Sequence, residues 1–188
     1  MEDNNYKGKK VYGGVFAGRM EAMRNIHGKE GLNAIFDRLR KIGYAGPDNE
    51  NVKLKQMYEI KDFMQFLETY FEMYGENDFR RMSKLSSRKK GIIGTFIRWA
   101  ATPEMIVSKV PMYWKQFYSF GELSATVENN KIMLTGKDTY VSPLLCESLT
   151  YYYQGILEFI GLKGVATKHT KCVGSGEDVC EWEITWNG

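Results

Sequence analysis

The C-terminal quarter of the chain contains all of its cysteines and one of its two histidines. They stand as Cys146, then the pair His169-x-x-Cys172, then Cys180 beyond a glycine-bearing loop. Three cysteines and a histidine form one of the usual closed, tetrahedral ligand sets of structural zinc. An odd number of cysteines cannot all pair within one chain, so a complete disulfide framework is excluded. We therefore predict a zinc ion held by these four residues.

Two plainer interpretations of the same residues stay open. The cysteines are also consistent with three buried, reduced thiols beside an unremarkable histidine, or with a Cys172–Cys180 disulfide in an oxidising setting. Zinc is favoured because the set uses nearly every soft ligand that the chain has. Four protein ligands leave no open position for a substrate, so we expect the metal to be structural.

Cys146 lies four positions after Ser142, which together with Pro143 is a typical helix start. The partial positive charge of a helix N-terminus favours the thiolate, which is the form of cysteine that binds metal. Zinc bound there would pin the last loop and strand to this helix. Structural zinc contributes on the order of 10 kcal/mol in small peptides.

Composition narrows the function classes. The chain has 188 residues and a net charge of +3, and it is 43% hydrophobic and 26% charged. No apolar run approaches the ~18–20 residues that span a bilayer, and the first residues lack a secretory signal, so we expect a cytoplasmic protein with no membrane span. The net charge is too small to indicate direct binding of nucleic acid. Phosphate-binding glycine loops and paired-carboxylate motifs are not found, so no catalytic residue is assigned and an enzyme is the less favoured class.

Periodicity predicts helices in the first two-thirds of the chain. Apolar residues recur at helical spacing over three segments, which are 19–42 with an interruption at His27-Gly28, 60–74 ended by Gly75, and 78–101. A short strand is expected over 10–16. Another helix begins at Thr102-Pro103, and Pro111 is expected to divide it into two short helices.

After Gly121 the period changes to that of strands. Alternation over 123–127 and the Asn129-Asn130 turn predict a hairpin. A helix from Ser142-Pro143 follows, and then strands over 165–171 and 181–186. The whole pattern predicts an α+β fold and a single domain over 1–188, in which N-terminal helices pack on a small, mainly four-stranded antiparallel sheet.

A wider pattern surrounds the four predicted ligands, and its members are Cys146, Gly155, Gly161, His169-x-x-Cys172, Gly176 and Cys180-x-Trp182. This pattern resembles the 4-vinyl reductase domain family and places the zinc-binding part in 120–188. That family belongs to a superfamily with haem-NO-binding domains, subunits of trafficking complexes and the sensor domains of phenol-responsive activators. The whole chain is also similar to a group of uncharacterised bacterial proteins common in myxobacteria.

The resemblance implies a compact ligand-binding module, often dimeric, with an apolar cavity between helices and sheet. It also implies zinc on the same four residues, with His169 standing where the phenol sensors have glutamate. Haem-binding relatives use a histidine on a helix and a Tyr-x-Ser-x-Arg motif. This sequence lacks that motif, so we expect no haem, and we interpret His27 as a capping residue beside Gly28.

The predicted function is a cytoplasmic, zinc-stapled ligand-binding or sensor module that forms a homodimer and holds a small hydrophobic molecule. Aromatic and methionine side chains suit such a pocket, and its lining is assigned to Phe96, Trp114, Phe117 and Tyr152, with plain core packing as the alternative. Other functions stay open: an enzyme or accessory acting on a tetrapyrrole-like substrate, or a protein-interaction scaffold. A run of basic residues between Arg80 and Arg98 is interpreted as a solvated helix face, with a phosphate, membrane-surface or partner patch as the alternative.

Overall fold

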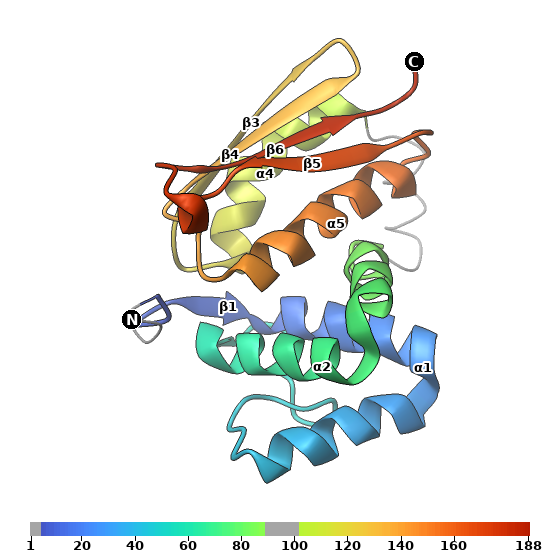
Figure 1. Ribbon diagram of the computed structural model, residues 1–188, viewed down its shortest axis with the longest axis vertical. Coiled ribbons are helices and arrows are strands. Elements are labelled where there is room, and N and C mark those ends of the chain that lie inside the picture. The colour runs from blue at the N-terminus through green and yellow to red at the C-terminus, as the bar shows by residue number, and fades with distance from the viewer. Residues whose placement is uncertain (1–4, 89–101) are drawn as a thin grey trace.

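The computed structural model describes residues 5–88 and 102–188. Within these ranges the elements follow in the order β1 (Lys10–Tyr12), α1 (Gly13–Lys41), β2 (Met57–Glu59), α2 (Ile60–Leu85), α4 (Pro103–Phe117), β3 (Glu122–Glu128), β4 (Lys131–Lys137), α5 (Pro143–Phe159), β5 (Ala166–Lys171), the short 3-10 turn η2 (Val173–Ser175) and β6 (Cys180–Thr185). Figure 1 shows α1 and α2 as one layer and the β3–β6 sheet as another, with α5 between them.

The larger sheet is antiparallel and has the strand order β3-β4-β6-β5. Asn129 and Asn130 connect β3 to β4 with φ of 45° and 48°, as in a two-residue type I′ hairpin. Alternate residues of β4 and β6 are buried, because α4 packs on β3 and α5 on β5 and β6. The predicted α+β class and the four-stranded antiparallel sheet are confirmed.

Strands β1 and β2 form a separate, antiparallel pair. Val11 in β1 is fully buried and also bridges to Tyr118, just after α4. The strand expected over 10–16 is therefore shorter than predicted, because α1 begins directly at Gly13. This pair ties the start of the chain to the end of α4.

Helices α1 and α2 pack against each other, and each bends at a glycine. Gly28 and Gly75 have φ of 72° and 76°, a region that glycine reaches without steric cost. The rings of His27 and Tyr74 stack at 3.9 Å, and His27 Nε2 lies 3.0 Å from the Tyr70 hydroxyl. The breaks expected at Gly28 and Gly75 are confirmed, because each glycine has a non-helical backbone that separates two helical stretches. One prediction is corrected: His27 packs between the two helices instead of capping an end.

Helices α4 and α5 begin as predicted. The side chains of Thr102 and Ser142 accept hydrogen bonds from the backbone N–H groups of Met105 and Leu145, at 3.3 Å and 3.1 Å, and a proline follows each cap. Pro111 does not divide α4, which runs through it unbroken. The ring is exposed, so water can satisfy the carbonyl that loses its hydrogen bond, while the opposite face of the helix stays packed on β3.

Helix α5 holds the two layers together. It packs on α2 on one side and on β5 and β6 on the other, and Leu145, Leu149 and Leu157 are buried along it. Trp182 of β6 is 1% exposed beneath it. No helix among the described residues is long and apolar enough to cross a membrane.

Candidate metal centre

The four residues predicted as metal ligands come together at the N-terminal end of α5. Cys146 lies on this helix, His169 on β5, Cys172 just beyond β5, and Cys180 at the first position of β6. One ligand atom from each lies within 4.8 Å of all the others. Cys146 and Cys180 are buried, and His169 and Cys172 are half-buried. Four residues that are far apart in the sequence thus form one compact cluster.

The spacing of the sulfur atoms suits a shared metal ion. Cys146 Sγ and Cys180 Sγ are 4.0 Å apart, whereas a disulfide would bring them to about 2.05 Å. Zinc–sulfur bonds of about 2.3 Å in a tetrahedron place two sulfurs about 3.8 Å apart. All three cysteines are free thiols here, so the Cys172–Cys180 disulfide considered from the sequence is not present.

The turn between β5 and β6 positions Cys172 close to Cys146. The backbone N–H groups of Ser175 and Glu177 both donate to the Cys172 carbonyl, at 2.9 Å and 3.2 Å, and the turn closes at Gly176 with φ of 92°. A side chain at Gly174 would lie 2.5 Å from the Tyr140 hydroxyl. A larger residue at this position would therefore require the Tyr140 ring to move.

A register shift in β5 orients the histidine. The pairing with β6 slips between His169 and Lys171, as in a β-bulge, which re-aims a side chain at the end of a strand. The His169 ring stacks on Trp182, with centroids 4.8 Å apart and planes at 12°. Its Nε2 is buried and has no hydrogen-bond partner among the described residues. A buried nitrogen without a partner is free to bind a metal.

Charge within the cluster concentrates on Cys180. The hydrogen bond with Cys146 lowers the pKa of Cys180 to about 4, and His169 and the backbone N–H of Val173 act in the same direction. The same hydrogen bond and burial raise the pKa of Cys146, and burial raises that of Cys172. Either thiol can donate in the hydrogen bond between Cys146 and Cys180, so the prediction that Cys146 is the thiolate stays a prediction.

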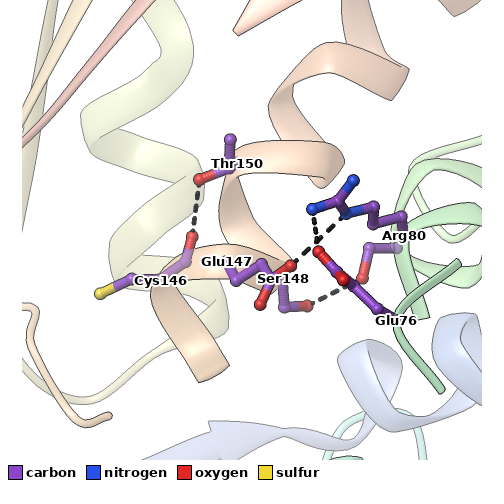
Figure 2. Close-up of polar contacts among 7 residues, drawn as sticks. Glu76, Arg80, Cys146, Glu147, Ser148 and Thr150 are labelled. Carbon is purple, nitrogen blue, oxygen red and sulfur yellow. Dashed lines mark hydrogen bonds and ion pairs between the residues drawn. The ribbon is translucent and has the colours of Figure 1, made fainter. Parts of the chain in front are cut away.

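Polar contacts fix α5 next to the cluster, as Figure 2 shows. Thr150 donates to the Cys146 carbonyl at 2.8 Å and accepts from Trp182 Nε1 at 3.0 Å. The helix turn that carries Cys146 is thereby locked to β6. Trp182 belongs to the recognised pattern, but nothing in the sequence singles out Thr150.

The same turn of α5 is also bonded to α2. Glu147 lies 3.6 Å from Arg80 Nε, and Arg80 also pairs with Glu76 on its own helix. Beside this ion pair, the hydroxyls of Ser83 and Ser148 lie 3.2 Å apart in the interior. The cluster is therefore connected to the N-terminal helices as well as to the sheet.

A hollow of about 340 Å³ opens against the cluster. Its lining residues are Pro143, Cys146, Glu147, Thr150, Tyr151, His169, Cys172 and Ser175. One side of the cluster is therefore reachable from this hollow. The opposite side is closed by Cys180, which is 0% exposed.

The residues assigned to a ligand pocket do not line this hollow. Trp114 is buried and stacks on Tyr118 at 4.3 Å, and Phe117 stacks on Tyr113 at 6.2 Å. Tyr152 lies on α5 near Arg19. Phe96 lies outside the described residues. The pocket assignment stays a prediction.

No protein-family model matches the chain, and no curated protein matches it in sequence. Solved structures do match. An H-NOX protein from S. oneidensis, in the Fe(II)NO ligation state, has a TM-score of 0.66 at 12% identity over 95% of this chain and 100% of that one. An oxygen-binding H-NOX domain related to soluble guanylate cyclases has a TM-score of 0.64 at 11% identity, covering 95% and 96%. A structure from work on haem redox potential and porphyrin distortion has a TM-score of 0.63 at 10% identity, covering 93% and 99%.

These matches correct the expectation that the chain has no haem. The neighbours that share the fold include haem proteins, so a missing motif is not sufficient evidence against haem. The described residues do not supply a free histidine ligand for it: His27 stacks on Tyr74, and His169 lies in the cysteine cluster. The likeness to these structures is one of fold alone, and the 4-vinyl reductase family stays a prediction. What the chain shares with the H-NOX domains is thus their fold, over nearly its whole length.

Proposed function

We propose that this protein is a ligand-binding sensor domain whose C-terminal sheet is held to α5 by a structural zinc ion. The observation that carries the proposal is the cluster of Cys146, His169, Cys172 and Cys180, with its ligand atoms within 4.8 Å of one another. These residues come from a helix, two strands and a turn. One ion would therefore cross-link α5 to the β5–β6 end of the sheet, in addition to the packing and the Trp182–Thr150 hydrogen bond between them.

Zinc fits this donor set better than the hard cations do. Thiolate and imidazole suit zinc, whereas magnesium and calcium prefer oxygen ligands. A complete set of four protein ligands is typical of structural rather than catalytic sites. The Trp182 ring on His169 and the Thr150 bond at Cys146 hold two of the ligands in place, in the way that outer contacts orient metal ligands elsewhere.

The sensor part of the proposal rests on the fold. H-NOX neighbours include an oxygen-binding domain and a protein with bound nitric oxide. We further propose that the protein binds a small hydrophobic molecule in its apolar interior. We also propose that it is related to 4-vinyl reductase domains, is cytoplasmic and forms a homodimer. The second candidate is a haem-based gas sensor, which the same neighbours favour.

Metal analysis of the purified protein tests the zinc centre. We expect one zinc per chain, lost in His169→Gln and kept in His27→Gln, which makes the same change at the other histidine. Absence of metal from the wild-type protein, or equal zinc in both variants, would reject the centre. An absorption spectrum of the same sample decides the second candidate, because a Soret band would show haem. Size-exclusion chromatography tests the homodimer.

A further inference from the structure

The bends of α1 and α2 lie side by side in the fold. Gly28 and Gly75 leave the helical backbone in the same way, with φ/ψ of 72°/−175° and 76°/−179°. The residues immediately before them, His27 and Tyr74, stack with ring centroids 3.9 Å apart. A helix break leaves backbone groups without helical partners, so side chains near these bends can take part in fixing their angles.

Tyrosine hydroxyls of α2 bond to the backbone at both bends. Tyr74 donates to the Gly31 carbonyl at 3.1 Å, three residues beyond the bend of α1. Tyr70 donates to the Asp78 carbonyl at 3.3 Å, and these two residues lie on opposite sides of the bend of α2. Each hydroxyl therefore helps to fix the angle of one bend.

The Tyr70 hydroxyl has one proton and two possible acceptors. Besides the Asp78 carbonyl, His27 Nε2 lies 3.0 Å from the hydroxyl oxygen. Burial raises the pKa of Tyr70, and the charge of Asp78 adds to the rise while that of Arg81 opposes it, so the hydroxyl keeps its proton. A carbonyl can only accept. If Nε2 carries no proton, the nitrogen and the carbonyl compete for the same hydrogen; if it carries one, Nε2 donates to Tyr70 and the carbonyl receives the hydroxyl proton.

Asp78 favours the protonated form of His27. One of its carboxylate oxygens, Oδ2, lies 3.6 Å from His27 Nε2, and the two side chains are 35% and 14% exposed, so water screens the attraction only in part. Tyr74 is neutral, because burial and the charge of Asp78 raise its pKa. Removal of the ring from water and the positive charge of Arg81 near Tyr70 oppose protonation. The charged ring donates from both nitrogens, so protonation fixes Nε2 as a donor.

We propose that His27 is a proton switch that controls the bend of α2. With the charged ring, His27 donates to Tyr70, Tyr70 donates to the Asp78 carbonyl, and the Asp78 carboxylate faces a positive partner. With the neutral ring, the ion pair is absent and Nε2 can compete for the Tyr70 hydrogen. Histidine ordinarily titrates between about pH 5 and 8. Mild acid therefore tightens the bend, and mild alkali loosens it.

The part of α2 beyond this bend leads to α5. Figure 1 shows that it turns away from the first part of the helix and toward α5. Arg80 there lies 3.6 Å from Glu147, and the hydroxyl of Ser83 lies 3.2 Å from that of Ser148. A change of angle at Gly75 therefore moves residues that contact the helix of the cysteine cluster. The inference adds acidity as an input to the domain, and it holds whichever metal or ligand the domain binds.

An NMR titration of the full chain from pH 5 to 8 tests the switch. The chain has only two histidines, and the ring signal of His27 is identified by its absence from His27→Gln. The amide signals of Gly75 and Asp78 are expected to move with the same midpoint as this ring. Hydrogen-exchange protection of the amides from 76 to 85 should be about threefold higher at pH 5.5 than at pH 7.5. Both responses should disappear in His27→Gln.

Two conservative variants distinguish a switch from a charged ring that only lies nearby. Tyr70→Phe keeps the histidine and the aspartate but should lose the pH dependence of protection beyond Gly75, because the linking hydroxyl is gone. Tyr74→Phe, the same change at the hydroxyl that bonds to α1, should retain it. Three results would overturn the proposal: a His27 ring that does not titrate in this range, protection that is independent of pH in the wild type, or the same pH dependence in wild type and Tyr70→Phe.

Discussion

The cysteine cluster and the surroundings of Arg19 both place charge against α5, but they balance it in different ways. In the cluster, the negative charge on Cys180 is stabilised by Cys146, His169 and a backbone N–H. Around Arg19, a positive charge meets only a helix end, a hydroxyl and aromatic rings. The cluster gathers ligands for a cation, whereas Arg19 is held by neutral groups of the protein itself. Loss of a ligand of the cluster should therefore reduce stability more than loss of a single polar contact elsewhere on α5.

Loss of a cysteine ligand is expected to have the largest effect. Cys180→Ser replaces the residue that is 0% exposed and carries the charge of the cluster. The loss approaches the contribution of structural zinc, on the order of 10 kcal/mol, which is comparable to the whole stability of a domain. Far-UV circular dichroism should show an unfolded or loosened chain without zinc. A variant that melts like the wild type would remove the contrast between the two regions.

Chelation gives the same comparison without a mutation. A strong chelator should lower the melting temperature of the wild-type protein, because the metal binds only the folded state. Zinc added back in excess should restore it, while magnesium should not. An unchanged melting temperature in the presence of the chelator would show that the four ligands pack without any ion.

The next largest loss of stability is expected on removal of the Thr150 hydroxyl, which lies beside the cluster. Thr150→Val leaves the buried Trp182 N–H without an acceptor, which should reduce the free energy of unfolding by about 1–3 kcal/mol. Urea denaturation measures this change. Thr126→Val, at an exposed position of β3, is the matched control and should stay within about 0.5 kcal/mol of the wild type. Equal losses in both variants would contradict a special role for Thr150.

The ion pair between the layers should contribute less. Arg80 and Glu147 are partly exposed, with side-chain exposures of 42% and 32%, so Glu147→Gln should cost less than about 1 kcal/mol. The difference from the wild type should shrink as salt is added, because ions screen exposed pairs. A large, salt-independent loss would mean that the pair is more deeply embedded than its exposure indicates.

The smallest effect on stability is expected at Tyr153. Its hydroxyl has no partner among the described residues, so Tyr153→Phe should leave the free energy of unfolding of the ligand-free protein unchanged or slightly raised. Parallel urea denaturation of this variant and Thr150→Val compares two buried hydroxyls on one helix. A loss as large as that of Thr150→Val would show that the Tyr153 hydroxyl is already satisfied.

The two regions also differ in how far the sequence alone could reveal them. Cysteine and histidine are rare in this chain, so their grouping near the C-terminus was sufficient to predict the cluster. The partners of Arg19 come from α2 and α5, and arginine, serine and tyrosine are too common to single out. Only the fold brings them together.

Local elements follow the same logic. The caps at Thr102 and Ser142 and the Asn129-Asn130 turn were predicted correctly, because short-range hydrogen bonds and backbone preferences determine them. The helix break at Pro111 and the capping role of His27 were predicted wrongly. In both, contacts with distant parts of the chain outweigh the local preference: α4 stays packed on β3, and His27 packs on Tyr70 and Tyr74 of α2.

Helix α5 has one consequence for how the two regions could communicate. Cys146 and Tyr153 lie seven residues apart on it, a spacing of about 10 Å along one face of a continuous helix. The helix is continuous between these two residues, so a displacement along its axis at Cys146 also moves Tyr153. By thermodynamic linkage, any ligand that binds more tightly to the zinc-loaded protein must in turn raise the affinity for zinc by the same factor.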